Sequence, residues 1–512
     1  MTRTGTSIRA RIRSRARDRG RAWSLLLGAV VLGSAVTATA NPTSRVPWPD
    51  GAHGPTDDEV DQLIEEAVGL DDRETQGEFL EAFERGEASE EIFLQQEDVD
   101  LRTYDHDRIF QFGDTTFAHE FINAEGYASG PRKLTPPSRV HKGARGGLDN
   151  YSCAGCHSVG GPNGSGSFAQ NTLAEGDGAR ASSSNPRNPL AILGSGFVDL
   201  LGREMTADLA RVRDEAVARA KASRAAVSVE LVTKGVSYGT LRVDRAGNLD
   251  TTGVEGISPD LVVRPFGWKG TTASIRRFDE EALRIHFGIQ SSVLITRNQH
   301  TPDPARLGSG PKWWDPDDDG TAREIEEGTL SALEVYAAML EVPTVLPPAA
   351  PELRRRWARG TELFDTLGCV ACHRRKLTLE GHVFDVMPDT TGGVPVPIDL
   401  LSEGDEPRSG KEVALFSDLK RHDMGPGLAD PHDAIDRVGR SVFMTRRLWG
   451  LAETAPYLHD GRAPTIPEAI LAHGGEAKGS RDAFAAMSAE DRGSVHVFLL
   501  SLTRASKPLV TR

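Results

Sequence analysis

The sequence of 512 residues predicts a mainly α-helical protein with two domains of similar construction and a small β insertion. Three observations support this class. A five-residue motif occurs twice, at 153–157 and 369–373, and a proline-rich segment at 343–351 lies between the two copies. Helical apolar spacing prevails elsewhere, except over 227–263, where apolar and polar residues alternate as in strands.

Both copies of the motif read Cys-x-x-Cys-His, and together they use all four cysteines of the chain. The residues are Cys153, Cys156 and His157 in the first copy and Cys369, Cys372 and His373 in the second. Two thiols at this spacing can add to the vinyl groups of one porphyrin, while the adjacent imidazole coordinates the iron. A redox dithiol, a disulfide or a zinc site is the alternative. The motifs predict two covalent haem c groups, each in a cytochrome c-like domain.

The N-terminus has the composition of an export signal. Eight arginines crowd the first 21 residues, an apolar run follows over 23–36, and Ala38-Thr39-Ala40 forms a small-residue cleavage site. This order predicts a signal peptide over 1–40 and a periplasmic or otherwise exported protein. An uncleaved anchor is the alternative. No other stretch is long and apolar enough to predict an integral membrane span.

The charge of the chain limits its partners. Removing 1–40 takes away eight Arg and one Asp and changes the formal net charge from −14 to −21. So acidic a chain is not expected to bind nucleic acid or anionic lipid. It would attract a small soluble electron-donor protein with a basic surface, although acidic surfaces also serve solubility.

The expected domains follow from these landmarks. An N-terminal helical extension covers 41–111, and the first haem domain covers 112–342, with a long helix within 194–225 and the β insertion at about 227–263. The linker at 343–351 precedes the second cytochrome c domain at 352–512. That domain is expected to begin with a helix over 352–366 and to close with one over 489–502, capped by Ser488.

An acidic loop at 315–326 matches the pattern D-x-D-x-D-G-x5-E. Its oxygen ligands would be Asp315, Asp317, Asp319, the Thr321 carbonyl and Glu326. Hard oxygen ligands at this spacing suit Ca2+, so the loop predicts a structural calcium site, followed by a helix over about 322–340. An acidic turn without metal is the alternative.

Three segments of the C-terminal half carry a family resemblance: 421–430, the stretch 443–463 with Pro-Tyr-Leu-His-Asp-Gly-Arg-Ala at 456–463, and 472–477. The chain resembles the bacterial dihaem cytochrome c peroxidase and MauG superfamily, most closely its dihaem oxidoreductase branch. The resemblance is specific over 360–505 and looser over 110–300. Members of this branch are sometimes labelled thiol oxidoreductases, but here every cysteine is used for haem attachment.

The resemblance implies the axial ligands of the second haem. In the family, the second ligand lies on the helix after the Pro-Tyr-x-His-Asp-Gly turn and is Met or, in MauG, Tyr; here that position is His473. We therefore expect His373 and His473 to coordinate this iron, with Met424 as the competing ligand and a histidine without a metal role at the end of a helix as the other alternative. An iron with two imidazole ligands is closed to small molecules, which suits the entry or storage of electrons.

The first haem departs from the family pattern, because no histidine occurs in the glycine-rich stretch soon after His157. Either its sixth position is open, or a distant residue such as His286, His119 or Met205 fills it. An open position would allow this haem to react with hydrogen peroxide or another small oxidant.

Peroxide chemistry also needs a group that moves a proton. The family uses a glutamate, and Glu204 is the candidate in this sequence; a solvated carboxylate near the start of a helix is the alternative. Trp268 is the candidate for an electron relay between the haems, against a role in packing. The histidine of the 456–463 turn, His459, is expected to order the loop beside the haem.

These expectations predict a peroxidase-like dihaem oxidoreductase of the EC 1.11.1 type. Electrons would enter at the bis-histidine haem and pass to the first haem, which would react with peroxide. The alternative is an electron-transfer cytochrome without catalysis. A binding protein with metal-held Cys-x-x-Cys loops is a third class.

Overall fold

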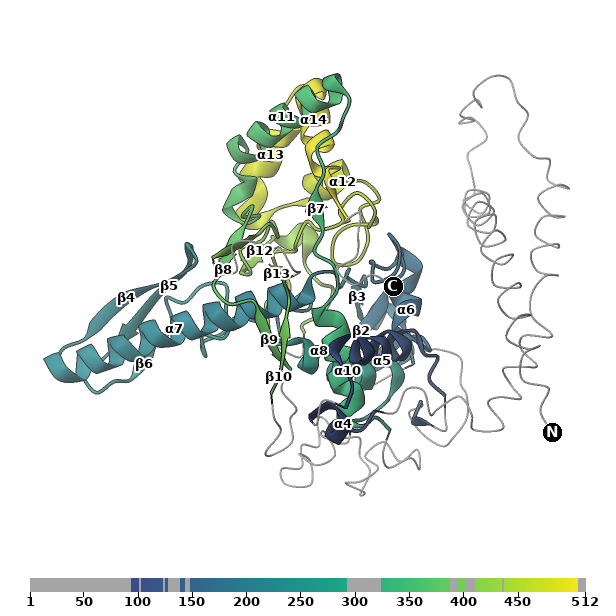
Figure 1. Ribbon diagram of the computed structural model, residues 1–512. Coiled ribbons are helices and arrows are strands. Elements are labelled where there is room, and N and C mark those ends of the chain that lie inside the picture. The colour runs from purple at the N-terminus through teal and green to yellow at the C-terminus, as the bar shows by residue number, and fades with distance from the viewer. Residues whose placement is uncertain are drawn as a thin grey trace, which may run out of the picture. The chain divides into compact units, whose positions relative to one another are not determined.

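The computed structural model describes residues 94–100, 103–122, 125–127, 139–142, 148–291, 324–386, 395–401, 410–434 and 437–504. All of these belong to the compact unit Glu91–Arg512 (Figure 1). The predicted signal peptide, most of the predicted N-terminal extension and the first nine residues of the calcium-type loop lie outside the described residues. Those expectations stay predictions.

Helix α10 (Glu327–Ala338) is the central helix of the first half of this unit, because all of its residues are buried. A helix buried on every side must be surrounded by other elements. It packs against α4 (Gln96–Asp100), α5 (His106–Ala118) and α8 (Ile275–Ala282). On α5, Gly113 lies against the backbone carbonyl of Ala332, where no larger residue would fit. The predicted helix at 322–340 is therefore present over a shorter range.

The predicted long helix and β insertion are both observed. Helix α7 (Ser195–Ser223) is followed by an antiparallel sheet in the order β4 (Val227–Thr233), β5 (Val236–Val243) and β6 (Leu249–Asp250). Strands β4 and β5 pack against α7 (Figure 1). In β5 the buried residues are Val236, Tyr238, Leu241 and Val243, and the residues between them are more exposed, as expected for a sheet with one covered face.

The remaining strands form small sheets. The first contains β1 (Val140–Lys142), β2 (Thr172–Gly176) and β3 (Asn185–Arg187). Four antiparallel pairs follow: β7 (Thr344–Val345) with β14 (Leu502–Thr503), β8 (Leu377–Leu379) with β11 (Lys411–Val413), β9 (Val383–Val386) with β10 (Val396–Asp399), and β12 (Arg421–Asp423) with β13 (Val442–Met444). Small sheets among helices are compatible with the predicted mainly α class.

The C-terminal helices are α11 (Pro351–Thr366), α12 (Ile466–Ala472), α13 (Lys478–Ala486) and α14 (Ala489–Leu499). Helix α11 packs on α14, where Gly360 lies against the backbone of Ser494 and leaves no space for a side chain. The predicted cap of α14 is confirmed, since the Ser488 hydroxyl accepts a hydrogen bond from the backbone N–H of Asp491.

Short helices complete the fold. They are α6 (Cys153–Cys156), η3 (Phe168–Gln170), η4 (Ala181–Ser183), the π-helix η5 (Leu283–Phe287), η6 (Cys369–Ala371), η7 (Pro426–Leu428) and η8 (Gly475–Ala477). An apolar cluster adjoins each Cys-x-x-Cys-His motif. Cys153 packs against one that contains Phe121 and Phe287, and Cys369 packs against one that contains Phe364 and Phe498.

Candidate functional site

The first motif forms the single turn of helix α6, which places its two cysteines on one side of the chain. The Ser152 hydroxyl caps this turn by accepting a hydrogen bond from the backbone N–H of Gly155, and the Asn150 amide donates to Sγ of Cys156 at 3.3 Å. None of the four cysteines is in a disulfide, so all remain available for attachment to a porphyrin.

His157 has the environment of a neutral metal ligand. Burial lowers its pKa to about 4, so the ring carries no charge at neutral pH. Its Nδ1 atom lies 3.3 Å from the carbonyl oxygen of Gly164, which leaves Nε2 for iron. Among the described residues, the one ring in contact with His157 is that of Phe117, with centroids 6.0 Å apart.

The second motif brings two imidazoles close together, with their planes tilted by 55°. Nδ1 of His373 donates to the carbonyl oxygen of Phe416 at 3.0 Å, and Nδ1 of His473, at the C-terminal end of α12, donates to that of Ala469 at 2.7 Å. Burial lowers the pKa of both rings, that of His373 to about 4. Metal-ligating histidines are held in this way through the ring nitrogen that does not bind the metal.

The spacing of these two rings fits a shared iron. Their centroids lie 6.5 Å apart. Metal–nitrogen bonds of about 2.0 Å on both sides, with about 1.1 Å from each nitrogen to its ring centre, give about 6.2 Å. Met424 lines the same cavity. The spacing of the two imidazoles is compatible with His473 as the sixth ligand, and the choice between His473 and Met424 stays a prediction.

A cavity of about 320 Å³ surrounds these two histidines, and its walls include both cysteines of the second motif. Arg446 and Arg447 line it, and Nε of Arg446 and Nη1 of Arg447 are buried without a hydrogen-bond partner among the described residues. Burial lowers the pKa of both guanidinium groups, that of Arg447 to about 10. Buried cations need anionic partners, and the two propionates of a haem would supply them. The cavity thus fits haem in its ligands, its attachment points and its charge.

Trp268 lies between this cavity and the loop that follows the first motif. Its indole Nε1 donates to the carbonyl oxygen of Asn188 at 2.8 Å, and the Asn188 amide donates to the carbonyl oxygen of Gly166. Trp268 also lines the cavity and contacts the ring of His459. Trp268 therefore lies beside the cavity of the second motif and is bonded to the segment that contacts the first, and its role as an electron relay stays a prediction.

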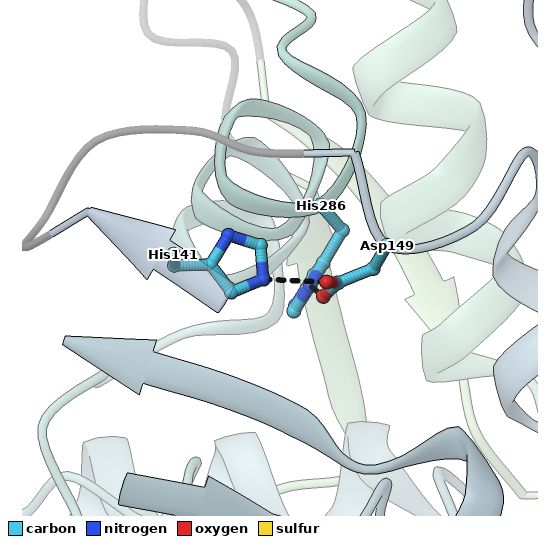
Figure 2. A group of neighbouring side chains, drawn as sticks. All are labelled: His141, Asp149 and His286. Atoms are coloured by element: carbon cyan, nitrogen blue, oxygen red, sulfur yellow. Dashed lines mark hydrogen bonds and ion pairs between the residues drawn. The ribbon is translucent and has the colours of Figure 1, made fainter. Parts of the chain in front are cut away.

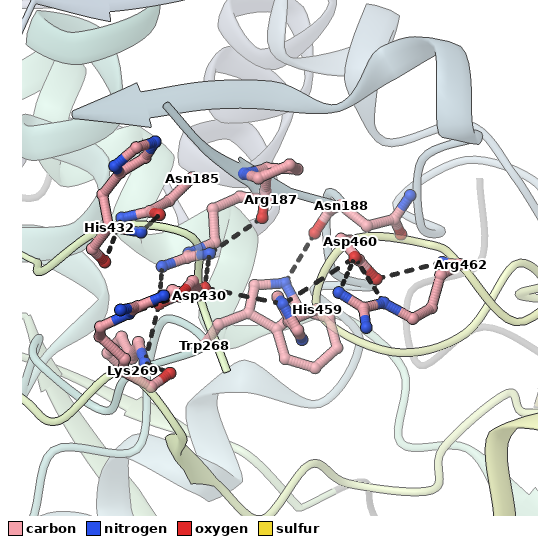
Figure 3. A network of polar contacts seen from close by, with 12 residues as sticks. Asn185, Arg187, Asn188, Trp268, Lys269, Asp430, His432, His459, Asp460 and Arg462 are labelled. Carbon is pink, nitrogen blue, oxygen red and sulfur yellow. Dashed lines mark hydrogen bonds and ion pairs between the residues drawn. The ribbon is translucent and has the colours of Figure 1, made fainter. Parts of the chain in front are cut away.

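A buried ionic network holds the same region together (Figure 3). Asp430 is fully buried and accepts two hydrogen bonds from Arg187, at 2.7 and 2.8 Å. It also forms an ion pair with Lys269 at 2.8 Å. His459 lies 3.6 Å from Asp430 and stacks on Phe443. The backbone N–H of Asn188 donates to the carbonyl oxygen of His459. This contact does not involve the imidazole, so the expected role of His459 in ordering the loop stays a prediction.

The hydrogen bonds and ion pair of the Glu204 carboxylate involve no residue of either Cys-x-x-Cys-His motif. Its carboxylate forms an ion pair with Lys234 at 2.6 Å and accepts hydrogen bonds from the backbone N–H groups of Glu380 and Gly381. These contacts join α7 to the β4–β5 turn and to the segment after β8. They give a structural role to the carboxylate, and the catalytic role stays a prediction without support from this geometry.

Asp279 on α8 is a carboxyl group that sequence reasoning missed. Its Oδ2 atom is buried without a hydrogen-bond partner among the described residues. Burial, followed by the charge of Glu334, raises its pKa well above the usual range. Burial and then the interaction with Asp279 raise the pKa of Cys153. No linear pattern distinguishes this aspartate from its acidic neighbours, because only folding places it near the first motif.

The three distant candidates for the sixth ligand of the first haem all have other partners. His119 contacts Glu125 through Nε2 at 2.8 Å, and His286 contacts Asp149 through Nδ1 at 2.6 Å. Met205 is fully buried in the apolar core along α7. Within the described part of the chain, no histidine ring is in contact with that of His157, although His286 interacts with it electrostatically.

Of the predicted calcium ligands, Glu326 is described, and it is the residue that precedes α10. Asp315, Asp317, Asp319 and Thr321 lie outside the described residues. The calcium site stays a prediction.

His422 provides a prediction about pH. Burial lowers its pKa, but hydrogen bonds with Asp418, at 2.8 Å, and with the side chain of Cys372 outweigh this, and the pKa rises to about 11. Because the pKa of His422 is higher in the folded state, protonated His422 stabilises the fold. This stabilisation is complete at pH values below the unfolded pKa of 6.5 and is lost as the pH rises towards 11. We expect the free energy of unfolding to fall more steeply with pH over this range in the wild type than in His422→Asn, as measured by urea titration. Parallel slopes would contradict this.

Comparisons with known proteins agree with the predicted resemblance. Residues 254–502 match the family described as "Di-haem oxidoreductase, putative peroxidase". This match confirms the resemblance to the dihaem peroxidase and MauG superfamily and indicates a dihaem oxidoreductase with haem cofactors. The comparison with curated proteins found no match.

Two solved structures are similar at low identity. Hydrazine synthase of Kuenenia stuttgartiensis shares 15% identity over 80% of this chain and 93% of its own, with a TM-score of 0.36. A MauG-like protein associated with microbial copper homeostasis shares 16% identity over 52% of this chain and 79% of its own, with a TM-score of 0.27.

No helix in the described ranges is long and apolar enough to cross a bilayer.

Proposed function

We propose that this chain, whose residues 254–502 match a family of dihaem oxidoreductases, is an exported peroxidase-like enzyme with two haem c groups of unequal roles. The observation that carries the proposal is the contrast between the two motifs. The ring of His373 faces that of His473, whereas the ring of His157 faces no second histidine among the described residues. Bound haem would supply a redox-active iron at each motif, closed at the second and open at the first.

Different residues of the chain serve electron entry, electron relay and the reaction with the oxidant. His373 and His473 hold the group that receives electrons from a small soluble donor protein, which the acidic charge of the chain would attract. Trp268, bonded to Asn188 between the two motifs, is the proposed relay. Cys153, Cys156 and His157 hold the group that meets hydrogen peroxide or another small oxidant.

Asp279 is the residue that we assign to proton movement at the first motif, in place of Glu204. Its carboxyl group is buried and interacts with Cys153, and burial raises its pKa well above the usual range. A carboxyl group with a raised pKa is suited to donate a proton to a leaving oxygen.

The experiment that tests the function is electron paramagnetic resonance of the ferric protein, recorded with and without peroxide. One high-spin and one low-spin haem, with peroxide consuming only the high-spin signal, is the expected result. Two low-spin haems indifferent to peroxide, even after one-electron reduction, would instead identify an electron-transfer cytochrome.

The variant Asp279→Asn is expected to lower peroxidase turnover by about 10²- to 10⁴-fold, the usual contribution of a positioned acid–base group. Steady-state assays with peroxide and a reduced donor measure this. Glu281→Gln is the matched control on the same helix, because Glu281 is paired with Arg277 and partly exposed. Equal turnover in the two variants would remove Asp279 from the mechanism.

A further inference from the structure

Three side chains outside the haem motifs converge on one point (Figure 2). His141 comes from β1, Asp149 from the segment before α6, and His286 from the π-helix η5. Nε2 of His141 lies 2.6 Å from one oxygen of Asp149, and Nδ1 of His286 lies 2.6 Å from the other. One ligand atom from each residue lies within 4.8 Å of the other two.

The first of these contacts is not a satisfied hydrogen bond. The side chains of His141 and Asp149 are 1% and 3% exposed. Despite their short separation, Nε2 of His141 and Oδ1 of Asp149 are not aligned as donor and acceptor, and both are buried without a hydrogen-bond partner among the described residues. Such atoms are rare in folded proteins, because burial removes water without replacing it. They are also the atoms with which these residues bind metal ions.

We propose that His141, Asp149 and His286 bind a divalent transition-metal ion of the zinc and copper class. Two imidazoles and one carboxylate are a donor set that such ions prefer, whereas Ca2+ and Mg2+ prefer oxygen alone. A metal ion beside Nε2 of His141 and Oδ1 of Asp149 would be coordinated by both atoms. It would also compensate the cost of burying that carboxylate.

The surroundings of Asp149 support a ligand role. The hydroxyl of Thr172 donates to Oδ2 of Asp149, and the backbone N–H of Asp149 donates to the carbonyl oxygen of His286. These contacts fix the carboxylate relative to the π-helix, as outer partners of metal ligands do. The pKa of Asp149 is lowered: burial opposes this, but the interactions with His141 and His286 outweigh burial.

The site is distinct from both haem motifs but adjoins the first. Asp149 interacts electrostatically with Cys156, and His286 with His157. The charge of a bound cation would therefore also change the electrostatic environment of the first haem. The other cluster of this kind, Cys372 with Asp418 and His422, is not comparable, since haem attachment uses Cys372.

Equilibrium dialysis of the dihaem protein against Zn2+, and separately Cu2+, tests the proposal through metal content measured by mass spectrometry. One ion per chain beyond the two haem irons is the expected result. His141→Ala and Asp149→Asn should each weaken binding at least about 100-fold. The matched control is His382→Ala, which removes a histidine from another His–Asp pair, 2.7 Å from Asp399, and should leave binding unchanged.

His286→Ala keeps the proposal testable if the buried variants do not fold, because the side chain of His286 is 33% exposed. Zn2+ should raise the melting temperature of the wild type and of His382→Ala but not that of His286→Ala. Absence of bound metal in the wild type would overturn the proposal. A change in the haem spectrum of His286→Ala with zinc binding intact would also overturn it and make His286 a haem ligand. None of these outcomes depends on peroxidase activity.

Discussion

The His473→Ala variant is expected to lose the low-spin signal of the second haem and at least about 100-fold of its turnover. Loss of an outer-shell partner of a metal ligand already costs up to that factor, and here a ligand itself is removed. The ring of His473 is the one that faces His373 across the cavity, at 6.5 Å between centroids. Electron paramagnetic resonance and steady-state peroxidase assays on the purified protein measure the two effects.

His432→Ala is the control for this prediction. Its ring lies at the surface, where Nε2 donates to the carbonyl oxygen of Ser182, so the spectrum and turnover should not change. A low-spin signal that persists in His473→Ala and disappears in Met424→Ala would assign the ligand to Met424 instead.

The Asp430→Ala variant is expected to lose about 3–5 kcal/mol of the free energy of unfolding, because it leaves buried cations without a counter-charge. Asp430 is 0% exposed, and its partners Arg187 and Lys269 are 16% and 5% exposed. The two cations come from segments far apart in the sequence (Figure 3), so the loss also loosens the junction between the two motifs. Urea titration followed by circular dichroism measures the change.

Asp260→Ala is the matched control, since its ion pair with Arg264 is a surface pair within one turn of chain, with side chains 48% and 24% exposed. Pairs of this kind contribute about 0–1 kcal/mol. If Asp430→Ala lost no more than this control, the network would not be a major source of stability. Asp430→Asn should fall between the two, because the amide can keep part of the hydrogen bonding.

Local patterns in the sequence were sufficient for much of the fold. Apolar spacing predicted α7 and the strands β4 and β5, and Ser488 predicted the start of α14. These features depend on residues within a few positions of one another. The range of α10 was predicted less well, because its ends depend on packing against α5 and α8 rather than on its own periodicity.

Sequence reasoning alone identified both Cys-x-x-Cys-His motifs, since haem attachment is a matter of local spacing, and the family resemblance added His473. Only the tertiary structure placed His473 opposite His373, buried Asp430 between two cations, and brought His141, Asp149 and His286 together. It also separated Glu204, held by Lys234, from Asp279, which interacts with Cys153. The physical reason is that a ligand set or a charge network is defined by distances between distant segments. Those distances are fixed by the packing of the whole core, which no local pattern encodes.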